Sequence, residues 1–131
     1  MRIATALALA IIATPALAER QWLPAQDFMA QVNGRATQVY AQDGTLFGTE
    51  YFLPKQRTIW QLAGETQCVN GAWAIRDDLT CYRYEGGYGS CIRYYMSADT
   101  IVSVDWVAGK PTATTYNLAI VDQAPPVCSA N

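Results

Sequence analysis

The chain contains no histidine, and this absence removes the usual base of nucleophilic catalysis. Ser-His-Asp and Cys-His arrangements need an imidazole, so both are excluded. Lysine is scarce: Lys55 and Lys110 each adjoin a proline in an expected turn, which makes a Ser-Lys pair a weak hypothesis. Zinc thiolate sites use closely spaced cysteine pairs, usually with histidine, and the cysteines here are far apart. We therefore expect no metal, no cofactor and no nucleophilic hydrolase.

Clusters of charge and long apolar segments are also missing. The chain has nine basic and eleven acidic side chains, spread without runs, so its charge does not favour nucleic acid or anionic membranes as partners. A membrane-spanning helix needs about 20 apolar residues, and no stretch reaches that length. We expect no membrane insertion, and a monomer.

The first eighteen residues have the features of a secretory signal peptide. Arg2 precedes an apolar run over residues 3–12, and the segment ends in Ala16-Leu17-Ala18. We predict cleavage before Glu19, which leaves residues 19–131 as a single β-domain. The expected location is periplasmic or secreted, where disulfides persist.

Short β-prone segments alternate with turn residues along most of the remaining chain. An exception is Pro24 to Gly34, whose apolar spacing predicts one short helix. Tight turns between successive strands favour an all-β fold, an antiparallel meander of about eight strands that forms an up-and-down barrel or a flattened sandwich. The expected strands are 35–41, 46–53, 57–63, 66–76 with a bulge at Asn70-Gly71, 79–85, 90–97, 100–107 and 112–121.

The four cysteines predict two disulfides. If residues 85–87 form a three-residue hairpin loop, Cys81 lies directly opposite Cys91, within bridging distance. A four-residue loop over 86–89 would instead put these cysteines on opposite faces. The glycines favour the three-residue loop, because they supply positive φ angles. Cys68 and Cys128 then form the second bridge.

One hairpin is rich in tyrosine and arginine, a combination that recognition surfaces use. The alternative interpretation is that about half of these rings fill the core while the arginines lie at its rim. The candidate binding residues, which we call the Tyr/Arg set, are Tyr82, Arg83, Tyr84, Tyr88, Arg93 and Tyr95, with Tyr94 beside them.

Tryptophans offer a second possible site. Trp60, Trp73 and Trp106 would line the lumen of a barrel, where they either hold an apolar ligand or simply fill the space. Alternation along residues 100–107 predicts that Val102, Val104 and Trp106 face the core, with Ser103 and Asp105 exposed.

Acidic residues leave one catalytic hypothesis open. Glu50, Glu85 and Asp105 would support glycoside chemistry if two of them met across a cleft. A solvated face is the simpler interpretation of all three.

Several motifs together resemble a known group of proteins. They are residues 48–54 (GTEYFLP), the Arg57-x-x-Trp60 that follows, Cys68-x-x-Gly71-x-Trp73, and Cys81-Tyr82-x-Tyr84 with Cys91. In this respect the chain, from Phe28 to about Met96, is similar to small exported alphaproteobacterial proteins described only as domains of unknown function. The resemblance implies a periplasmic location and a compact β-domain, and it brings no catalytic residues.

These features together predict a non-catalytic exported binding domain that contacts a protein or a small ligand. An inhibitor of a protease or lysozyme is the first alternative, and a carboxylate-based hydrolase is a weaker one. An apolar cavity open at one end of a barrel would favour a small ligand. A filled lumen with an exposed aromatic patch would favour a protein partner.

Overall fold

The computed structural model describes residues 20–129, and the predicted signal peptide lies outside the described residues. Within this range the chain forms one helix and nine strands, in good agreement with the expected segments. Their bounds are β1 (Gln21–Leu23), α1 (Ala25–Val32), β2 (Ala36–Tyr40), β3 (Leu46–Leu53), β4 (Arg57–Leu62), β5 (Val69–Arg76), β6 (Leu79–Tyr84), β7 (Gly89–Ser97), β8 (Thr100–Val107) and β9 (Lys110–Val121).

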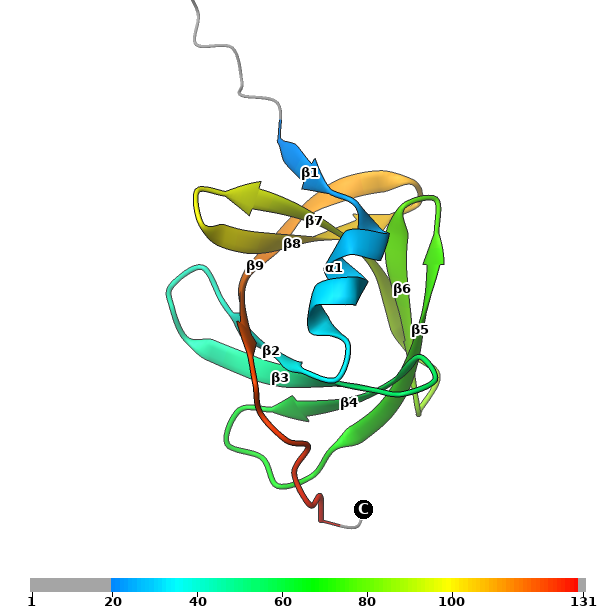
Figure 1. The fold of residues 1–131 in the computed structure, drawn as a ribbon, viewed down its shortest axis with the longest axis vertical. Coiled ribbons are helices and arrows are strands. Elements are labelled where there is room, and N and C mark those ends of the chain that lie inside the picture. Colours follow the sequence, from blue (N-terminus) through cyan, green and yellow to red (C-terminus); the bar gives the residue numbers. More distant parts are fainter. Residues whose placement is uncertain (1–19, 130–131) are drawn as a thin grey trace, which may run out of the picture.

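Strands β2 to β9 form a closed antiparallel barrel of eight strands. Each strand pairs with the next along the chain, and β2 also pairs with β9, which closes the ring. Figure 1 looks into this ring, with α1 in its centre. Closure leaves no free edge in the barrel itself. The structure therefore decides between the two predicted architectures in favour of the barrel.

Tight turns set the register of the hairpins. Asp77 and Asp78 both have positive φ, at 51° and 58°, as a two-residue hairpin turn of mirror-image type requires. The next hairpin has the three-residue loop, since the Tyr84 amide donates to the Tyr88 carbonyl at 2.9 Å. Cys81 accordingly lies opposite Cys91. The predicted register is confirmed.

Both predicted disulfides are present. Cys81 bridges to Cys91 within the β6–β7 hairpin, and Cys68 bridges to Cys128 in the tail that follows β9. The tail is also held by backbone pairing, because the Ser129 amide donates to the Thr66 carbonyl at 2.9 Å. The two bridges close sequence separations of 10 and 60 residues. Both should stabilise the fold by restricting the unfolded chain.

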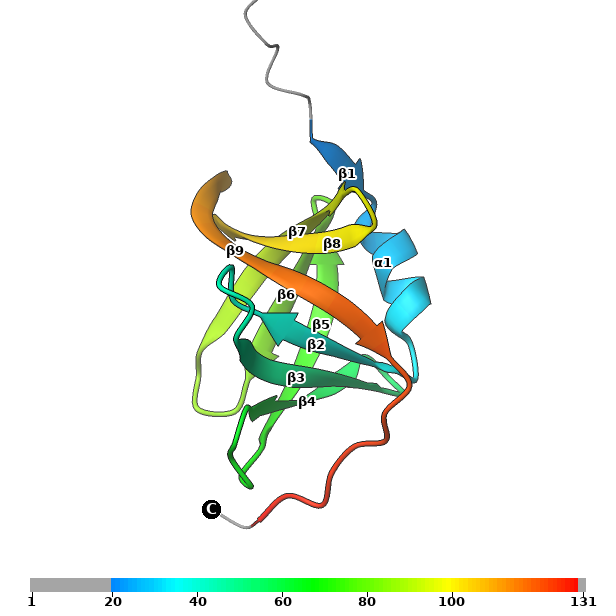
Figure 2. The same cartoon turned by 90° about the vertical axis from the view of Figure 1, so that its left-hand side faces the viewer.

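Helix α1 closes one end of the barrel. Its buried face consists of Ala25, Phe28, Met29 and Val32, and the Phe28 ring stacks on Tyr94 with 3.7 Å between centroids. The Ala25 amide donates to the Asp78 carboxylate at 2.9 Å, which ties the first turn of the helix to the β5–β6 turn. Figure 2 shows α1 on one side of the barrel and the β2–β3, β6–β7 and β8–β9 turns on the other.

Strand β1 was not predicted, and it extends the sheet outside the barrel. It pairs with the second half of β7, where β6 no longer reaches. Trp22 packs edge-on against Tyr95 and Trp106, at 5.7 and 5.6 Å between centroids, and the Arg93 guanidinium lies 4.3 Å above the Trp22 ring. We call these four residues the outer cluster.

The prediction that Val102, Val104 and Trp106 face the core was wrong, because Ser103 and Asp105 are on the side of β8 that lines the lumen. Ser103 is 3% exposed, while Val102 and Val104 on the opposite face of β8 are buried as well. Their cross-strand neighbours on β7 are Tyr95 and Arg93, so this outer face lies against the outer cluster. Because both faces of β8 are covered, the polar residues cannot be assigned to the solvent side by alternation.

The described residues contain no helix long and apolar enough to cross a membrane.

Candidate binding cavity

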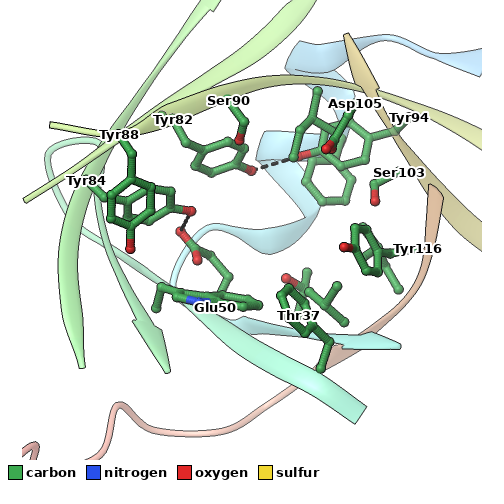
Figure 3. A pocket seen from close by; sticks show the side chains of 17 residues that line it. Thr37, Glu50, Tyr82, Tyr84, Tyr88, Ser90, Tyr94, Ser103, Asp105 and Tyr116 are labelled. Atoms are coloured by element: carbon green, nitrogen blue, oxygen red, sulfur yellow. Dashed lines mark hydrogen bonds between the residues drawn. The ribbon is translucent and has the colours of Figure 1, made fainter. Parts of the chain in front are cut away.

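A cavity of about 260 Å³ occupies the barrel lumen. Phe28 of α1 lines it from the closed end. Phe47 and Tyr88 also line it, and because they are 43% and 54% exposed, the cavity reaches solvent beside them. The seventeen lining residues, many of them labelled in Figure 3, are Phe28, Thr37, Val39, Phe47, Glu50, Trp60, Tyr82, Tyr84, Tyr88, Gly89, Ser90, Ile92, Tyr94, Ser103, Asp105, Tyr116 and Leu118.

A β-bulge brings Phe47 to the cavity. Val39 pairs with Gly48 but Tyr40 pairs with Leu46, so Phe47 is the extra residue between them. The ring stacks on Tyr116 at 5.2 Å between centroids and lies 5.5 Å from Trp60. Strict alternation would place Phe47 and Gly48 on opposite faces, and sequence reasoning did not identify Phe47 for this reason.

Two inward-facing glycines make room for the cavity walls. A Cβ on Gly48 would lie 2.5 Å from the Trp60 ring, and a Cβ on Gly71 would lie 2.6 Å from the Tyr84 ring. The bulge predicted at Gly71 is not present, because β4, β5 and β6 keep a regular register around it. Gly71 instead allows the Tyr84 ring to lie flat across β5.

Glu50 is the one fully buried acidic residue among those described, at 4% exposure. Its side chain rises from β3 into the cavity, and the Tyr84 hydroxyl donates to Oε1 at 2.9 Å (Figure 3). The second oxygen, Oε2, and the buried hydroxyl of the neighbouring Thr58 both lack a hydrogen bond of good geometry among the described residues. Burial raises the pKa of Glu50 to about 8, while the neighbouring hydroxyl groups of Thr58 and Tyr84 act in the opposite direction. Glu50 is therefore mainly a neutral acid at pH 7.

Two further tyrosines form a second polar pair in the lumen. The hydroxyls of Tyr82 and Tyr94 are 2.7 Å apart, in a hydrogen bond that either can donate (Figure 3). Burial raises the pKa of both phenols well above the usual value, and the nearby Glu50 carboxyl acts in the same direction. Both stay neutral, so they offer hydrogen bonds and ring faces without charge.

Asp105 adds a second carboxyl group to the lining. It follows Ser103 on the inward side of β8, and partial burial raises its pKa. No lysine or arginine is among the lining residues. The cavity thus combines aromatic rings, hydroxyls and two carboxyl groups, and its ionisable groups are all acids.

The structure divides the Tyr/Arg set between two faces of the sheet. Tyr82 and Tyr84 point into the lumen, and Tyr88 lies at the mouth, stacked on Tyr84 with 5.4 Å between centroids. Arg83 is exposed on the outer surface, in a hollow shared with Trp106 and the Cys81–Cys91 bridge. The set therefore does not form one continuous recognition surface.

Arg93 and Tyr95 belong to the outer cluster. Besides its contact with Trp22, the Arg93 guanidinium lies 5.6 Å from the centroid of the Trp106 ring and 3.7 Å from the Asp78 carboxylate. These contacts hold β1 against the barrel and explain the positions of both residues structurally. Of the three tryptophans predicted to line the lumen, only Trp60 lines the cavity. Trp106 lies in the outer cluster, and Trp73 packs against the core without lining the cavity.

The predicted carboxylates are also separated. Glu50 and Asp105 both line the cavity, whereas Glu85 is exposed at the β6–β7 turn and accepts a hydrogen bond from the Asn70 side chain at 3.3 Å. Between residues 20 and 129, no three His, Cys, Asp or Glu side chains come together in a group that could hold a metal ion.

Comparison with known proteins adds no functional information. No protein-family model, no curated protein and no solved structure matches the chain. The resemblance to small exported alphaproteobacterial proteins remains a prediction.

Proposed function

We propose that this protein is an exported, non-catalytic binding domain that holds a small molecule in the lumen of its barrel. The observation that carries the proposal is the cavity of about 260 Å³, lined by aromatic rings and open beside Tyr88 and Phe47. Ligand sites are typically concave, largely apolar and provided with a few polar groups that fix orientation. Glu50, Ser103 and Asp105 are polar groups of this kind.

The size of the cavity limits the ligand. Pockets for drug-sized molecules have volumes of roughly 300 to 1,000 Å³. A cavity just below this range suits a compact molecule of one or two rings. Because α1 closes the far end through Phe28, a ligand enters and leaves through the mouth and cannot pass through the barrel.

An NMR titration tests this function. The probe is 3-propylindole, an uncharged two-ring compound, added to ¹⁵N-labelled protein. Saturable shifts of the Trp60 indole N–H, with much smaller shifts of the Trp106 indole N–H, are the expected result, because only Trp60 lines the cavity. Shifts centred on Trp106, or no saturable shifts with either 3-propylindole or the related amine tryptamine, would contradict binding in the lumen.

A pair of matched variants separates the lumen from the outer surface. Ser103→Leu adds bulk at a buried lining residue, and Ser97→Leu makes the same change at an exposed position of β7. We expect the first to weaken binding of 3-propylindole at least tenfold and the second to change it less than twofold. Equal effects would indicate a site elsewhere.

A carboxylate-based hydrolase is the second candidate, because Glu50 and Asp105 line one cavity. A neutral buried acid beside a more solvated carboxylate is the pairing that glycosidases use. Release of nitrophenol from 4-nitrophenyl glycosides at pH 6, lost in both Glu50→Gln and Asp105→Asn, would support this function. Release no faster than in buffer would count against it.

A further inference from the structure

We infer that the ligand of the cavity is an organic ammonium ion carrying an aromatic or fused-ring group, bound by the Glu50 carboxylate and by the faces of the surrounding rings. This inference rests on the proposed function and specifies the class of ligand. It depends on three features of the lumen: the sign of its ionisable groups, the unsatisfied carboxyl group, and the arrangement of the rings.

The ionisable groups of the lumen favour a cation over an anion. The groups that face Glu50 across the lumen are phenols and one carboxyl group, and none is cationic; they are Tyr82, Tyr84, Tyr88, Tyr94, Asp105 and Tyr116. An anionic ligand would meet two acids and no base. A cation is the only charged ligand whose field is complementary to this lining.

The unsatisfied carboxyl group favours a hydrogen-bond donor. Oε2 of Glu50 is buried without a hydrogen-bond partner, and an unpaired buried polar atom costs about 1–3 kcal/mol. An alkylammonium group supplies three donors and a positive charge, so it satisfies this oxygen and allows the carboxyl group to ionise. A ligand of this kind explains why the carboxyl group is buried with one oxygen unpaired and only the hydroxyl groups of Tyr84 and Thr58 near it.

The rings favour an organic cation over a metal ion. Trp60 and Tyr116 pack around Phe47 on one side of the lumen, and Tyr88 stacks on Tyr84 on the other. Ring faces attract ammonium groups and also pack against an apolar ring of the ligand. A hard metal ion would require a shell of oxygen ligands, which these rings do not provide.

Proton balance distinguishes this mode of binding from simple apolar binding. In the free protein at pH 7, Glu50 is mainly protonated. When an ammonium ion binds, the Glu50 proton leaves to the buffer, the carboxylate pairs with the cation, and the ligand keeps its own proton. An uncharged ligand of the same shape leaves the proton on Glu50.

Calorimetry at pH 7, in buffers with different ionisation enthalpies, measures this proton. The probes are tryptamine, its uncharged isostere 3-propylindole, and the anion indole-3-propionate. From a pKa of about 8 we expect tryptamine to release about 0.9 proton per molecule bound. Its affinity should rise roughly 50-fold from pH 6 to pH 8 as Glu50 ionises. 3-Propylindole should release no proton, and indole-3-propionate should bind at least tenfold more weakly than tryptamine.

The variant Glu50→Gln provides the matched control, since it keeps the shape and removes the charge. We expect this variant to bind tryptamine at least tenfold more weakly than the original protein does, and to bind 3-propylindole less than threefold more weakly. If tryptamine binds no better than 3-propylindole, or binds without releasing a proton, the ammonium inference is wrong while the proposed function stands. If none of the three indoles binds, both are wrong.

Discussion

Replacing Glu50 by glutamine should stabilise the protein above pH 7, and this expectation follows directly from the buried carboxyl group. The pKa of Glu50 rises from an ordinary value of 4.5 to about 8 in the folded protein. The folded state therefore holds the proton more tightly than the unfolded chain does. The stabilisation from this proton is complete below about pH 4.5 and is lost as the pH rises through 8.

The magnitude follows from the interval between the two pKa values. It spans about three and a half pH units, and each unit corresponds to about 1.4 kcal/mol. The free energy of unfolding should thus fall by about 5 kcal/mol in total because of this one group, as the pH rises from well below 4.5 to above 8. This change is a large part of the free energy of unfolding of a small domain, which is typically about 5–15 kcal/mol.

The assay is urea unfolding at several pH values from 5 to 9, followed by circular dichroism. Other titrating groups, including Asp105, act equally in both proteins and cancel in the difference. Glutamine also retains an oxygen that can accept the Tyr84 hydrogen bond. We expect similar stabilities at pH 5 and a clear advantage for Glu50→Gln at pH 9. A difference that does not change with pH would refute the argument.

Three other predictions concern the framework around the cavity. Gly71→Ala should lower the free energy of unfolding by about 1–3 kcal/mol, because its new methyl group meets the Tyr84 ring and the Thr58 hydroxyl. In a Tyr84→Ala background the part of this cost that comes from the ring should disappear. Replacing both Cys68 and Cys128 by alanine should lower the free energy of unfolding by about 4 kcal/mol, compared with about 3 kcal/mol when Cys81 and Cys91 are replaced, because the Cys68–Cys128 bridge closes a much longer loop. Equal urea midpoints for the two variants would contradict this order. Arg93→Ala should speed amide hydrogen exchange in β1 and change the affinity for 3-propylindole less than twofold. A loss of binding would show that the outer cluster takes part in ligand binding.

The hairpins could be predicted from the sequence because they depend on local chemistry. The glycines at 86 and 87 both adopt positive φ, and the three-residue loop they permit is sufficient to pair Cys81 with Cys91. Elimination then assigned the remaining bridge. The register of a hairpin follows from its turn by counting residues outward along both strands. The strand boundaries could therefore be predicted to within a few residues without knowledge of long-range contacts.

The interior of the barrel could not be predicted in the same way. Alternation shows which residues share a face, but it does not show which face is the lumen when β1 covers the outside, and Ser103 was placed on the wrong side for this reason. The bulge at Phe47 shifts the strand register by one residue, and the amino-acid pattern around it does not indicate this shift. Gly48 and Gly71 carried a usable signal: small residues on strands leave space for large rings on neighbouring strands.

The central claim, that the lumen holds a small cationic ring compound, is tested most directly by the position of bound tryptamine. Intermolecular nuclear Overhauser effects should connect the tryptamine ring to the ring protons of Trp60 and Tyr116, which line the cavity. Effects to Trp22 or Trp106 of the outer cluster, with none to Trp60, would place the ligand outside the barrel and contradict the claim.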